Sequence, residues 1–175
     1  MNDALKEISI ILDVWDDIFS DFDPRPLDER ALSQDFINEL KKRYRETSKG
    51  DLLISFFAPK SLKDDRSEKM VTLRLRKHFK DRAMQKKRDM WNMRSRGAVF
   101  VLAGISSLCA ITLLAFFNVV PELAGKLLES LFVPLGWFGV WEGFSQIVNA
   151  SPLFANEEKL YRQLSTAEYH FHYEP

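Results

Sequence analysis

Two groups of side chains, one near each end of the chain, are of types that can ligate metals. The first is a set of acids: Asp13, Asp16, Asp17, Asp21 and Asp23. Their spacing does not fit a calcium loop, which needs alternating ligands, a glycine and a late glutamate, so it predicts a solvated acidic face. The second group is His170 and His172, two residues apart. A histidine pair alone is a weak metal signal, and we expect these two to be ordinary strand residues.

Residues that build catalytic centres are sparse. The chain has one cysteine, Cys109, which excludes an internal disulfide and a cysteine-based zinc cluster. The sequence holds no Ser/His/Asp order, phosphate loop or zincin motif, and its seven glycines are too few for a Gly-rich nucleotide loop. We therefore expect no catalytic residue, no metal and no cofactor, and a non-enzymatic protein is favoured over a membrane-anchored enzyme.

The strongest electrostatic feature is a basic segment in the middle of the chain. The net charge is zero, but residues 1–68 sum to −5, residues 69–96 to +9 (11 bases and 2 acids) and residues 97–175 to −4. Beside a membrane, such a segment attracts anionic headgroups at about 1 kcal/mol per base. Alternatively, it only fixes the orientation of the chain. Nucleic acid is not an expected partner. Candidate contacts for anionic lipid or a protein partner are Arg74, Arg76, Lys77, Lys80, Lys86, Lys87, Arg88, Arg94 and Arg96.

Two apolar segments follow the basic one. Residues 97–121 contain no charge, and about 20 apolar residues suffice for a helix to cross a ~30 Å hydrocarbon core, which predicts a span at about 98–118. A second run, at about 127–148, contains Pro134 and Glu142 and predicts either a second crossing or a re-entrant segment. The first span starts too far along the chain to be a cleaved signal peptide.

An ionisable residue at membrane depth is a functional candidate, and Glu142 is one. It could carry a proton or pair with Arg94 or Arg96. Alternatively, the second span ends near Trp141, and Glu142 then lies at the interface beside an aromatic belt of Trp137 and Trp141.

Small residues at intervals of four mark candidate helix contacts. Gly139 and Gly143 follow the small-xxx-small pattern that lets helices approach closely. Ala103 and Ser107 lie on a small-residue stripe of the first span. We expect these positions to pack the two spans together, to form a seam between copies of the chain, or both.

The basic flank also predicts the orientation. Lys and Arg near the ends of a span stay on the cytoplasmic side. The flank before the first span is rich in bases, whereas the link between the spans holds one, Lys126. Both termini are therefore predicted to be cytoplasmic, with residues 118–128 on the outside.

The remaining segments predict a small domain. Residues 7–14 and 51–58 are rich in β-branched or aromatic residues and are predicted strands, whereas residues 34–46 carry one apolar stripe and are a predicted helix. Residues 168–173 alternate and could form a third strand. If the C-terminus is cytoplasmic, that strand can reach the same sheet.

Residues 67–96 lack glycine and proline and predict one long helix, with Ser67 as a candidate N-cap. The predicted fold class is thus an α+β cytoplasmic domain of two to three strands and helices. A long basic helix joins it to an α-helical two-span transmembrane hairpin. The predicted domains are a cytoplasmic domain, the basic helix, the hairpin and a cytoplasmic tail, at 1–66, 67–96, 97–149 and 150–175.

Three phrases of the sequence occur in a recognisable order. They are Asp23-Pro24-Arg25-Pro26-Leu27-Asp28-Glu29-Arg30-Ala31-Leu32, then Gly136-Trp137-Phe138-Gly139-Val140-Trp141, then Lys159-Leu160-Tyr161-Arg162-Gln163-Leu164. With them, most of the chain resembles a widespread family of uncharacterised small bacterial two-span membrane proteins. The sequence departs from the family's pattern directly after Trp141, where the family continues with a charged residue, a proline and an aromatic cluster and this chain continues with Glu142-Gly143-Phe144. It implies a bacterial plasma membrane and supplies no activity.

The leading hypothesis is a non-enzymatic plasma-membrane protein that acts as an interaction scaffold or as a sensor or regulatory subunit through its cytoplasmic domain. Its expected partners are membrane lipid, including anionic headgroups, and a protein partner or further copies of the chain. The alternative is a small oligomeric channel or pore formed by two-span hairpins, with Glu142 and the small-residue stripes lining or sealing it.

Overall fold

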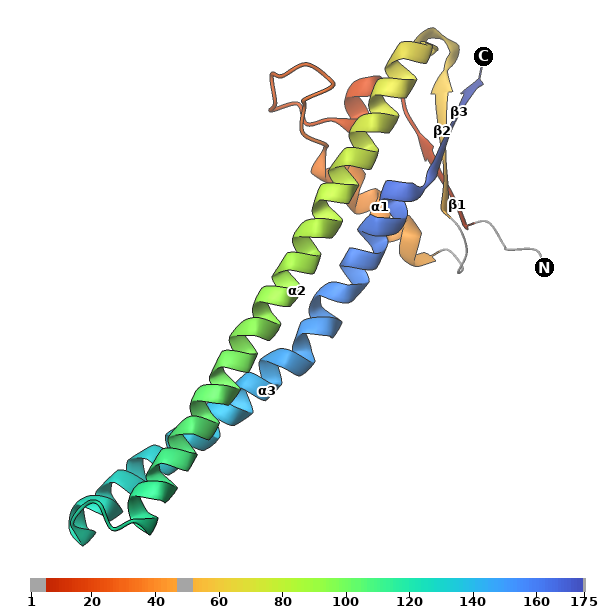
Figure 1. The fold of residues 1–175 in the computed structure, drawn as a ribbon. Helices are drawn as coiled ribbons and strands as arrows, with labels where there is room; N and C mark the ends of the chain where they lie inside the picture. The colour runs from red at the N-terminus through yellow and green to blue at the C-terminus, as the bar shows by residue number, and fades with distance from the viewer. Residues whose placement is uncertain (1–5, 47–51, 175) are drawn as a thin grey trace. The chain divides into compact units, whose positions relative to one another are not determined.

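The computed structural model describes residues 6–46 and 52–174, and the chain divides into two compact units (Figure 1). Met1–Met84 together with Glu157–Pro175 form the first, here called the sheet unit, and Gln85–Asn156 form the second, the helix-pair unit. Residues 1–5 and 47–51 of the predicted N-terminal domain, including the first residue of the strand predicted at 51–58, lie outside the described residues.

A three-stranded parallel sheet organises the sheet unit. Its strands are β1 (Lys6–Ile11), β2 (Leu52–Pro59) and β3 (Glu168–Glu174), in the order β1-β2-β3, and both neighbouring pairs are parallel. Ile54 of β2 is in register with Ile8 on one side and with Tyr169 on the other. The sheet confirms the two predicted N-terminal strands and the possible third strand at the C-terminal end.

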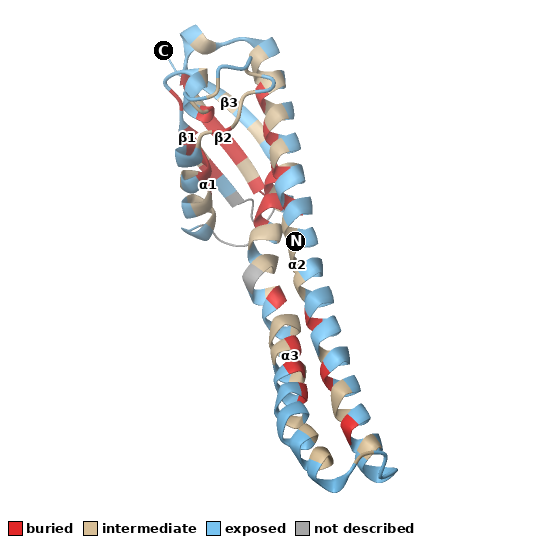
Figure 2. Ribbon diagram, turned by 90° about the vertical axis from the view of Figure 1, so that its left-hand side faces the viewer, coloured by how far each residue is buried: buried red, intermediate tan, exposed pale blue. Residues whose placement is uncertain are grey.

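One face of the sheet carries the core of this unit. α1 (Gln34–Glu46) matches the predicted helix and lies on this face, as do the first turns of α2 (Asp65–Phe116) and the last turns of α3 (Glu122–Thr166) (Figure 1). Two short 3₁₀ turns, Trp15–Ile18 and Lys60–Leu62, follow β1 and β2. The helices bury mainly Phe36, Ile37, Leu40, Val71, Leu75, Phe79, Leu160, Tyr161 and Leu164, and Figure 2 shows buried residues gathered where helices and sheet meet.

The long helix α2 is capped by Asp64, so the prediction of Ser67 as its N-cap is wrong. The Asp64 carboxylate accepts hydrogen bonds from the Ser67 backbone N–H at 3.1 Å and from the Ser67 hydroxyl at 2.6 Å. These bonds lower the pKa of Asp64. A carboxylate here satisfies an orphan amide and also faces the positive end of the helix dipole.

α3 continues through the segment predicted as a cytoplasmic tail. It contains Pro134 and Pro152, each of which removes one backbone hydrogen-bond donor, and it still runs to Thr166 before β3 begins. The reason lies in its last turns, where Leu160 and Leu164, spaced for one helix face, are buried in the core of the sheet unit.

The division of the chain differs from the predicted domains. Sequence reasoning placed the end of the N-terminal domain at residue 66, but the sheet unit includes α2 as far as Met84. Val71, Leu75 and Phe79 are completely buried there, because a sheet face of this size needs more cover than α1 alone supplies. The first part of the basic segment is therefore a core helix of the sheet unit.

Candidate interaction surfaces

The second face of the sheet is an unusual surface of the sheet unit. Parallel sheets are normally covered on both faces, yet among the described residues no helix packs on this one, here called the bare face (Figure 1). Ile11 lies there with 79% of its surface exposed. The side chains of the bare face are Glu7, Ser9, Ile11, Leu53, Ser55, Phe57, Glu168, His170, His172 and Glu174.

Polar and aromatic contacts order the centre of the bare face. The buried Ser55 hydroxyl donates to Glu7 at 2.8 Å, and the Phe57 ring stacks on His172 at 5.0 Å between centroids. His170 and His172 do share one face of a strand, as predicted. Within the described part of the chain, no group of three or more His, Cys, Asp or Glu residues could hold a metal ion.

A groove of about 530 Å³ lies near the carboxyl ends of β1 and β2. Arg43 reaches it from α1, donating through one guanidinium nitrogen to the Ser9 carbonyl and through Nε to Glu39 at 2.6 Å. Sequence reasoning missed this arginine, because nothing in the spacing of α1 brings it to β1. The residues that line the groove include Ser9, Ile11, Asp13, Arg43, Phe57, Pro59 and Glu174.

The aspartate cluster stabilises local turns. The Asp17 carboxylate accepts the backbone N–H groups of Asp13 and Val14 at 2.8 and 3.0 Å, and Asp16 pairs with Arg30 at 2.8 Å. Three of these five aspartates, counting Asp23, are thus engaged in holding the loop after β1.

Asp23 is the centre of that loop. It accepts the Arg25 guanidinium at 2.7 Å and the Ala31 backbone N–H at 2.7 Å, and these two bonds hold the pKa of the Asp23 carboxyl well below its usual range. The loop presents Phe22 with 97% of its surface exposed.

The nine candidate basic residues fall into two groups. Two of them serve the sheet unit: Arg74 donates to the carbonyls of Glu29 and Arg30 at 3.0 Å, and Arg76 donates to the Ala167 carbonyl at 3.2 Å. These two donate to the chain's own backbone, and their assignment as lipid or partner contacts stays a prediction. The other seven lie farther along or elsewhere on α2: Lys86 is half-buried, and Lys77, Lys80, Lys87, Arg88, Arg94 and Arg96 are exposed.

In the helix-pair unit, α2 and α3 pack through glycines. A Cβ atom on Gly97 would lie 2.6 Å from the Gly143 carbonyl oxygen, and one on Gly104 would lie 2.7 Å from the Val140 nitrogen. A Cβ on Gly139 would also meet Gly104, its Cα at 3.2 Å. The predicted Gly139 and Gly143 contacts thus pack the two helices together. Their partners Gly97 and Gly104 were missed, although their spacing of seven residues places them on one helix face.

Ala103 and Ser107 lie elsewhere. They line a groove of about 540 Å³ on the helix-pair unit, together with Phe132 and Leu128 of α3. Ala103 is exposed and Ser107 is half-buried, so this stripe does not form the close helix contact. The groove is also lined by Ser106, Ala110, Ile111 and Leu114.

Glu142 lies beside the level at which the charge-free part of α2 begins. Its neighbour Gly143 contacts Gly97, the first residue of the uncharged run. Glu142 is half-buried and accepts a hydrogen bond from Gln146 at 2.9 Å. Trp137 and Trp141 point outward, with 63% and 72% of their surfaces exposed. This position at the edge of the apolar run favours the interfacial interpretation of Glu142 over the mid-membrane one.

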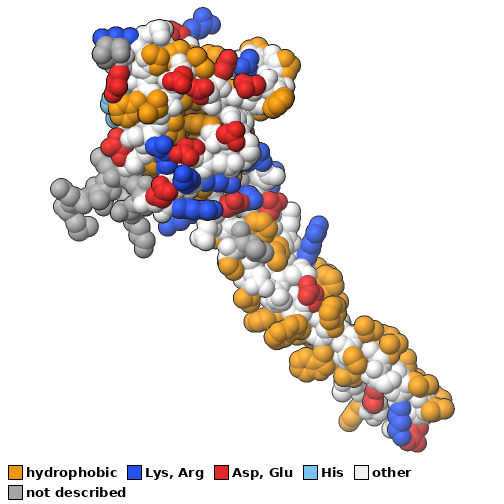
Figure 3. Space-filling view, turned by 180° about the vertical axis from the view of Figure 1, so that it is seen from behind, with side chains coloured by type: hydrophobic (Ala, Val, Ile, Leu, Met, Phe, Trp, Pro, Cys, Tyr) orange, Lys and Arg blue, Asp and Glu red, His pale blue; other side chains and the backbone are white. Residues whose placement is uncertain are grey.

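Many apolar side chains of the helix-pair unit face outward. Both α2 and α3 are long and apolar enough to cross a membrane, and in their most apolar windows of 18 residues only 11% and 6% of the residues are buried. Figure 3 shows hydrophobic side chains spread along the visible surface of this unit. Exposed members include Val99, Leu102, Ile105, Leu113, Leu131, Leu135, Phe138 and Phe144.

Comparison with protein-family models, with curated proteins and with solved structures finds no match for the chain. The resemblance to the small two-span bacterial membrane proteins therefore stays a prediction.

Proposed function

We propose that this chain is a non-enzymatic integral protein of the bacterial plasma membrane that works by binding other proteins. In this proposal α2 and α3 cross the membrane as a hairpin, and the sheet unit lies in the cytoplasm. It presents the bare face to a partner, as a scaffold or as a sensor or regulatory subunit.

The apolar surface of the helix-pair unit supports the membrane part of this proposal. A helix of a soluble protein hides its apolar residues, whereas the apolar windows of both helices are almost unburied. Contiguous exposed apolar surface on this scale needs a lipid or protein environment. The backbone groups within such helices are bonded internally, apart from the one bond that Pro134 removes from α3, and the hydrocarbon core requires such internal bonding.

The pairing of the chain's two ends carries the proposal. β1 precedes both apolar helices and β3 follows them, yet both strands pair with β2 in one sheet. An even number of crossings is then the arrangement that keeps β1 and β3 on one side of a membrane. The bases that precede Gly97 favour the cytoplasmic side for that sheet.

The bare face supports the binding part of the proposal. A parallel sheet with one uncovered face leaves apolar side chains such as Ile11 in water. A protein that covered Ile11 and the Phe57–His172 stack would bury this surface.

Photo-cross-linking in living cells tests the binding. A photoreactive residue replaces Ile11 on the bare face in one strain, and Asn38, exposed on α1, in a matched control. We expect a defined protein adduct from position 11 that is absent from position 38. Equal labelling from both positions, or none from position 11, would contradict the proposal.

One observation favours the alternative of a small oligomeric channel. The groove lined by Ala103 and Ser107 offers a concave, small-residue surface against which a helix of another copy could pack. Conductance of the reconstituted protein, altered by Glu142→Gln, would establish the channel. A reconstituted protein that does not conduct would exclude it.

A further inference from the structure

We propose that a cluster of bases just outside the apolar part of α2 binds the phosphate groups of anionic phospholipids. The cluster, called the basic collar, consists of Lys87, Arg88, Arg94 and Arg96. The inference rests on the proposed membrane insertion of α2 and α3, and it names the lipid class that the inserted protein selects.

The collar lies directly before the apolar part of α2. It ends one residue before Gly97, where the charge-free run of α2 begins and where α2 contacts Gly143 of α3. If the apolar run lies in the hydrocarbon core, Arg94 and Arg96 lie at the level of the lipid phosphates. Lys87 and Arg88 lie about 14 Å before Gly97 along the helix, which is within about one Debye length of that level.

The helix-pair unit has a charge imbalance. Residues 85–96 of α2 contain five bases and one acid, a net charge of +4, whereas residues 149–156 of α3 contain no charged residue. These segments face each other, because Arg94 donates to the Ser151 hydroxyl and Lys86 lies 5.7 Å from the centre of the Phe154 ring. The segment opposite the collar therefore supplies no counter-charge.

Three acids lie nearest to the collar along α2 and α3. Asp89 is counted in the net charge of +4, Glu142 accepts a hydrogen bond from Gln146 at 2.9 Å, and Glu157 pairs with Lys41 of α1 at 3.2 Å. At the other end of the helix pair, Glu122 and Lys126 neutralise one another at 2.6 Å. The excess positive charge is thus confined to the collar end.

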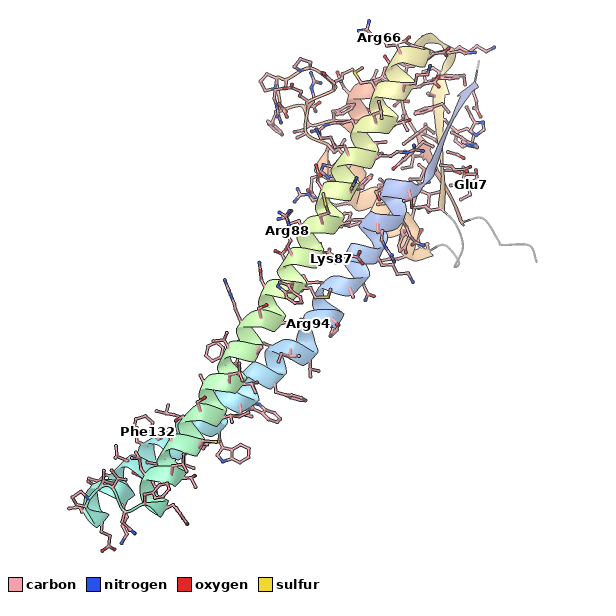
Figure 4. All side chains as sticks on the ribbon, viewed as in Figure 1. Glu7, Arg66, Lys87, Arg88, Arg94 and Phe132 are labelled. Atoms are coloured by element: carbon pink, nitrogen blue, oxygen red, sulfur yellow. The ribbon has the colours of Figure 1, made fainter. Side chains whose placement is uncertain are left out.

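Three bases of the collar surround an exposed indole, that of Trp91. Lys87, Arg88 and Arg94 lie four, three and three residues from Trp91, so they share its helix face. Trp91 has 70% of its surface exposed, and an exposed tryptophan is typical of the membrane interface. Figure 4 shows the three labelled bases on this stretch of α2.

A lipid fits this surface better than an acidic protein does. The collar adjoins the exposed apolar side chains, so its ligand needs negative charge directly beside hydrocarbon, which an anionic phospholipid combines in one molecule. Each base near the surface contributes about fivefold to the preference for negatively charged lipid.

The test uses Trp91 as the reporter. In the full chain, Trp15, Trp137 and Trp141 are replaced by phenylalanine, and the protein is reconstituted in two sets of vesicles. Both contain the same mixture of phosphatidylglycerol and phosphatidylcholine. In one set the phosphatidylglycerol carries bromine atoms near the carbonyl end of its acyl chains. In the other set an equal amount of the phosphatidylcholine carries them instead.

We expect Trp91 fluorescence to be quenched at least about fivefold more by the brominated phosphatidylglycerol. Lys87→Gln with Arg88→Gln and Arg96→Gln should bring the two quenching values close together, whereas Lys126→Gln at the other end should leave the preference intact. Arg94 is left unchanged because its bond to Ser151 joins the two helices.

The outcomes separate this inference from the proposed function. Equal quenching by both lipids, in a protein that floats with the vesicles, would overturn the lipid preference and leave membrane insertion standing. A protein that neither floats nor is quenched would overturn both. Native mass spectrometry of the unsubstituted chain, released from mixed nanodiscs, repeats the test without the tryptophan replacements and should show retained phosphatidylglycerol.

Discussion

At the scale of single residues, glycine decides how closely the two long helices approach. The predicted Gly139 and Gly143 meet Gly104 and Gly97 in the helix-pair unit, with backbone against backbone. The motif on α3 could be found from its sequence spacing alone. Its partners Gly97 and Gly104 were missed: their spacing of seven residues places them on one helix face, but it does not show that this face turns toward α3.

A single methyl group at this contact should loosen the pair. Gly143→Ala places a Cβ 2.7 Å from the Val101 nitrogen, so backbone must shift, and we expect a loss of about 1–3 kcal/mol in unfolding free energy. Gly125→Ala is the matched control: its Cβ would meet only Val120 Cγ2, at an ordinary 3.6 Å. For Gly125→Ala the unfolding free energy should be unchanged or should rise by up to about 1 kcal/mol. Denaturant titration in detergent, followed by helical circular dichroism, compares the two, and equal losses would contradict the glycine contact.

His78 should make the sheet unit sensitive to mild acid. Burial lowers the pKa of His78 to about 4, with Arg82 and Arg74 adding to the effect and Asp81 opposing it, and its Nε2 is buried without a hydrogen-bond partner. In the unfolded chain the ordinary pKa is about 6.5. Above that pH both states are neutral, so the histidine has no effect on stability. As the pH falls from about 6.5 to about 4, the unfolded chain takes up the proton first, and stability is lost.

The measurement is thermal unfolding of the full chain at pH 7 and at pH 5, followed by near-ultraviolet circular dichroism. His78→Phe should reduce the loss between the two pH values, whereas His172→Gln on the bare face should leave it unchanged. If the His78→Phe protein keeps the full loss, another group is responsible for the pH dependence.

At the scale of elements, local patterns predicted most of the architecture. β1, β2 and α1 could be predicted because their apolar residues recur at the period of a strand or a helix. Ile54 of β2 and Phe36 of α1 belong to these patterns. What the patterns could not show is the role of the first turns of α2. A helix with so many bases is typical of an exposed element, yet its Val71, Leu75 and Phe79 complete the core of the sheet unit.

The candidate interaction surfaces could likewise be predicted only in part. The basic character of α2 was visible in the sequence, but the use of Arg74 and Arg76 within the sheet unit depends on carbonyls of Glu29, Arg30 and Ala167, which no local pattern reveals. The open second face of the sheet was equally hidden, since alternation shows that two faces differ and does not show what covers each.

Strand β3 should contribute strongly to the sheet unit although it ends the chain. Phe171 packs on Phe56 at 5.1 Å and on Trp15 at 5.6 Å between ring centroids. Phe171→Ala should therefore lower the unfolding free energy of this unit by about 2 kcal/mol, below the range for a fully buried phenylalanine. Ile11→Ala on the bare face is the control and should change it by no more than about 0.5 kcal/mol. Hydrogen exchange of the β2 amides measures the loss of unfolding free energy in each variant. Similar losses in the Phe171→Ala and Ile11→Ala proteins would show that β3 is not part of the core.

At the scale of the whole molecule, the sheet pairs strands that lie on either side of the proposed membrane hairpin in the sequence. The first and last strands pair with the same central strand, while the segments between them include two apolar helices. These features support a protein whose sheet unit stays on one side of the membrane while the turn between α2 and α3 lies on the other.

Site-directed labelling in intact cells tests this central claim most directly. In a chain whose Cys109 is replaced by serine, a single cysteine is placed either at Val119, exposed between α2 and α3, or at Ser61, in the sheet unit. A membrane-impermeant maleimide added outside should label position 119 in intact cells and position 61 only after the cytoplasmic side is opened. Labelling of position 119 only from the cytoplasmic side would contradict the hairpin.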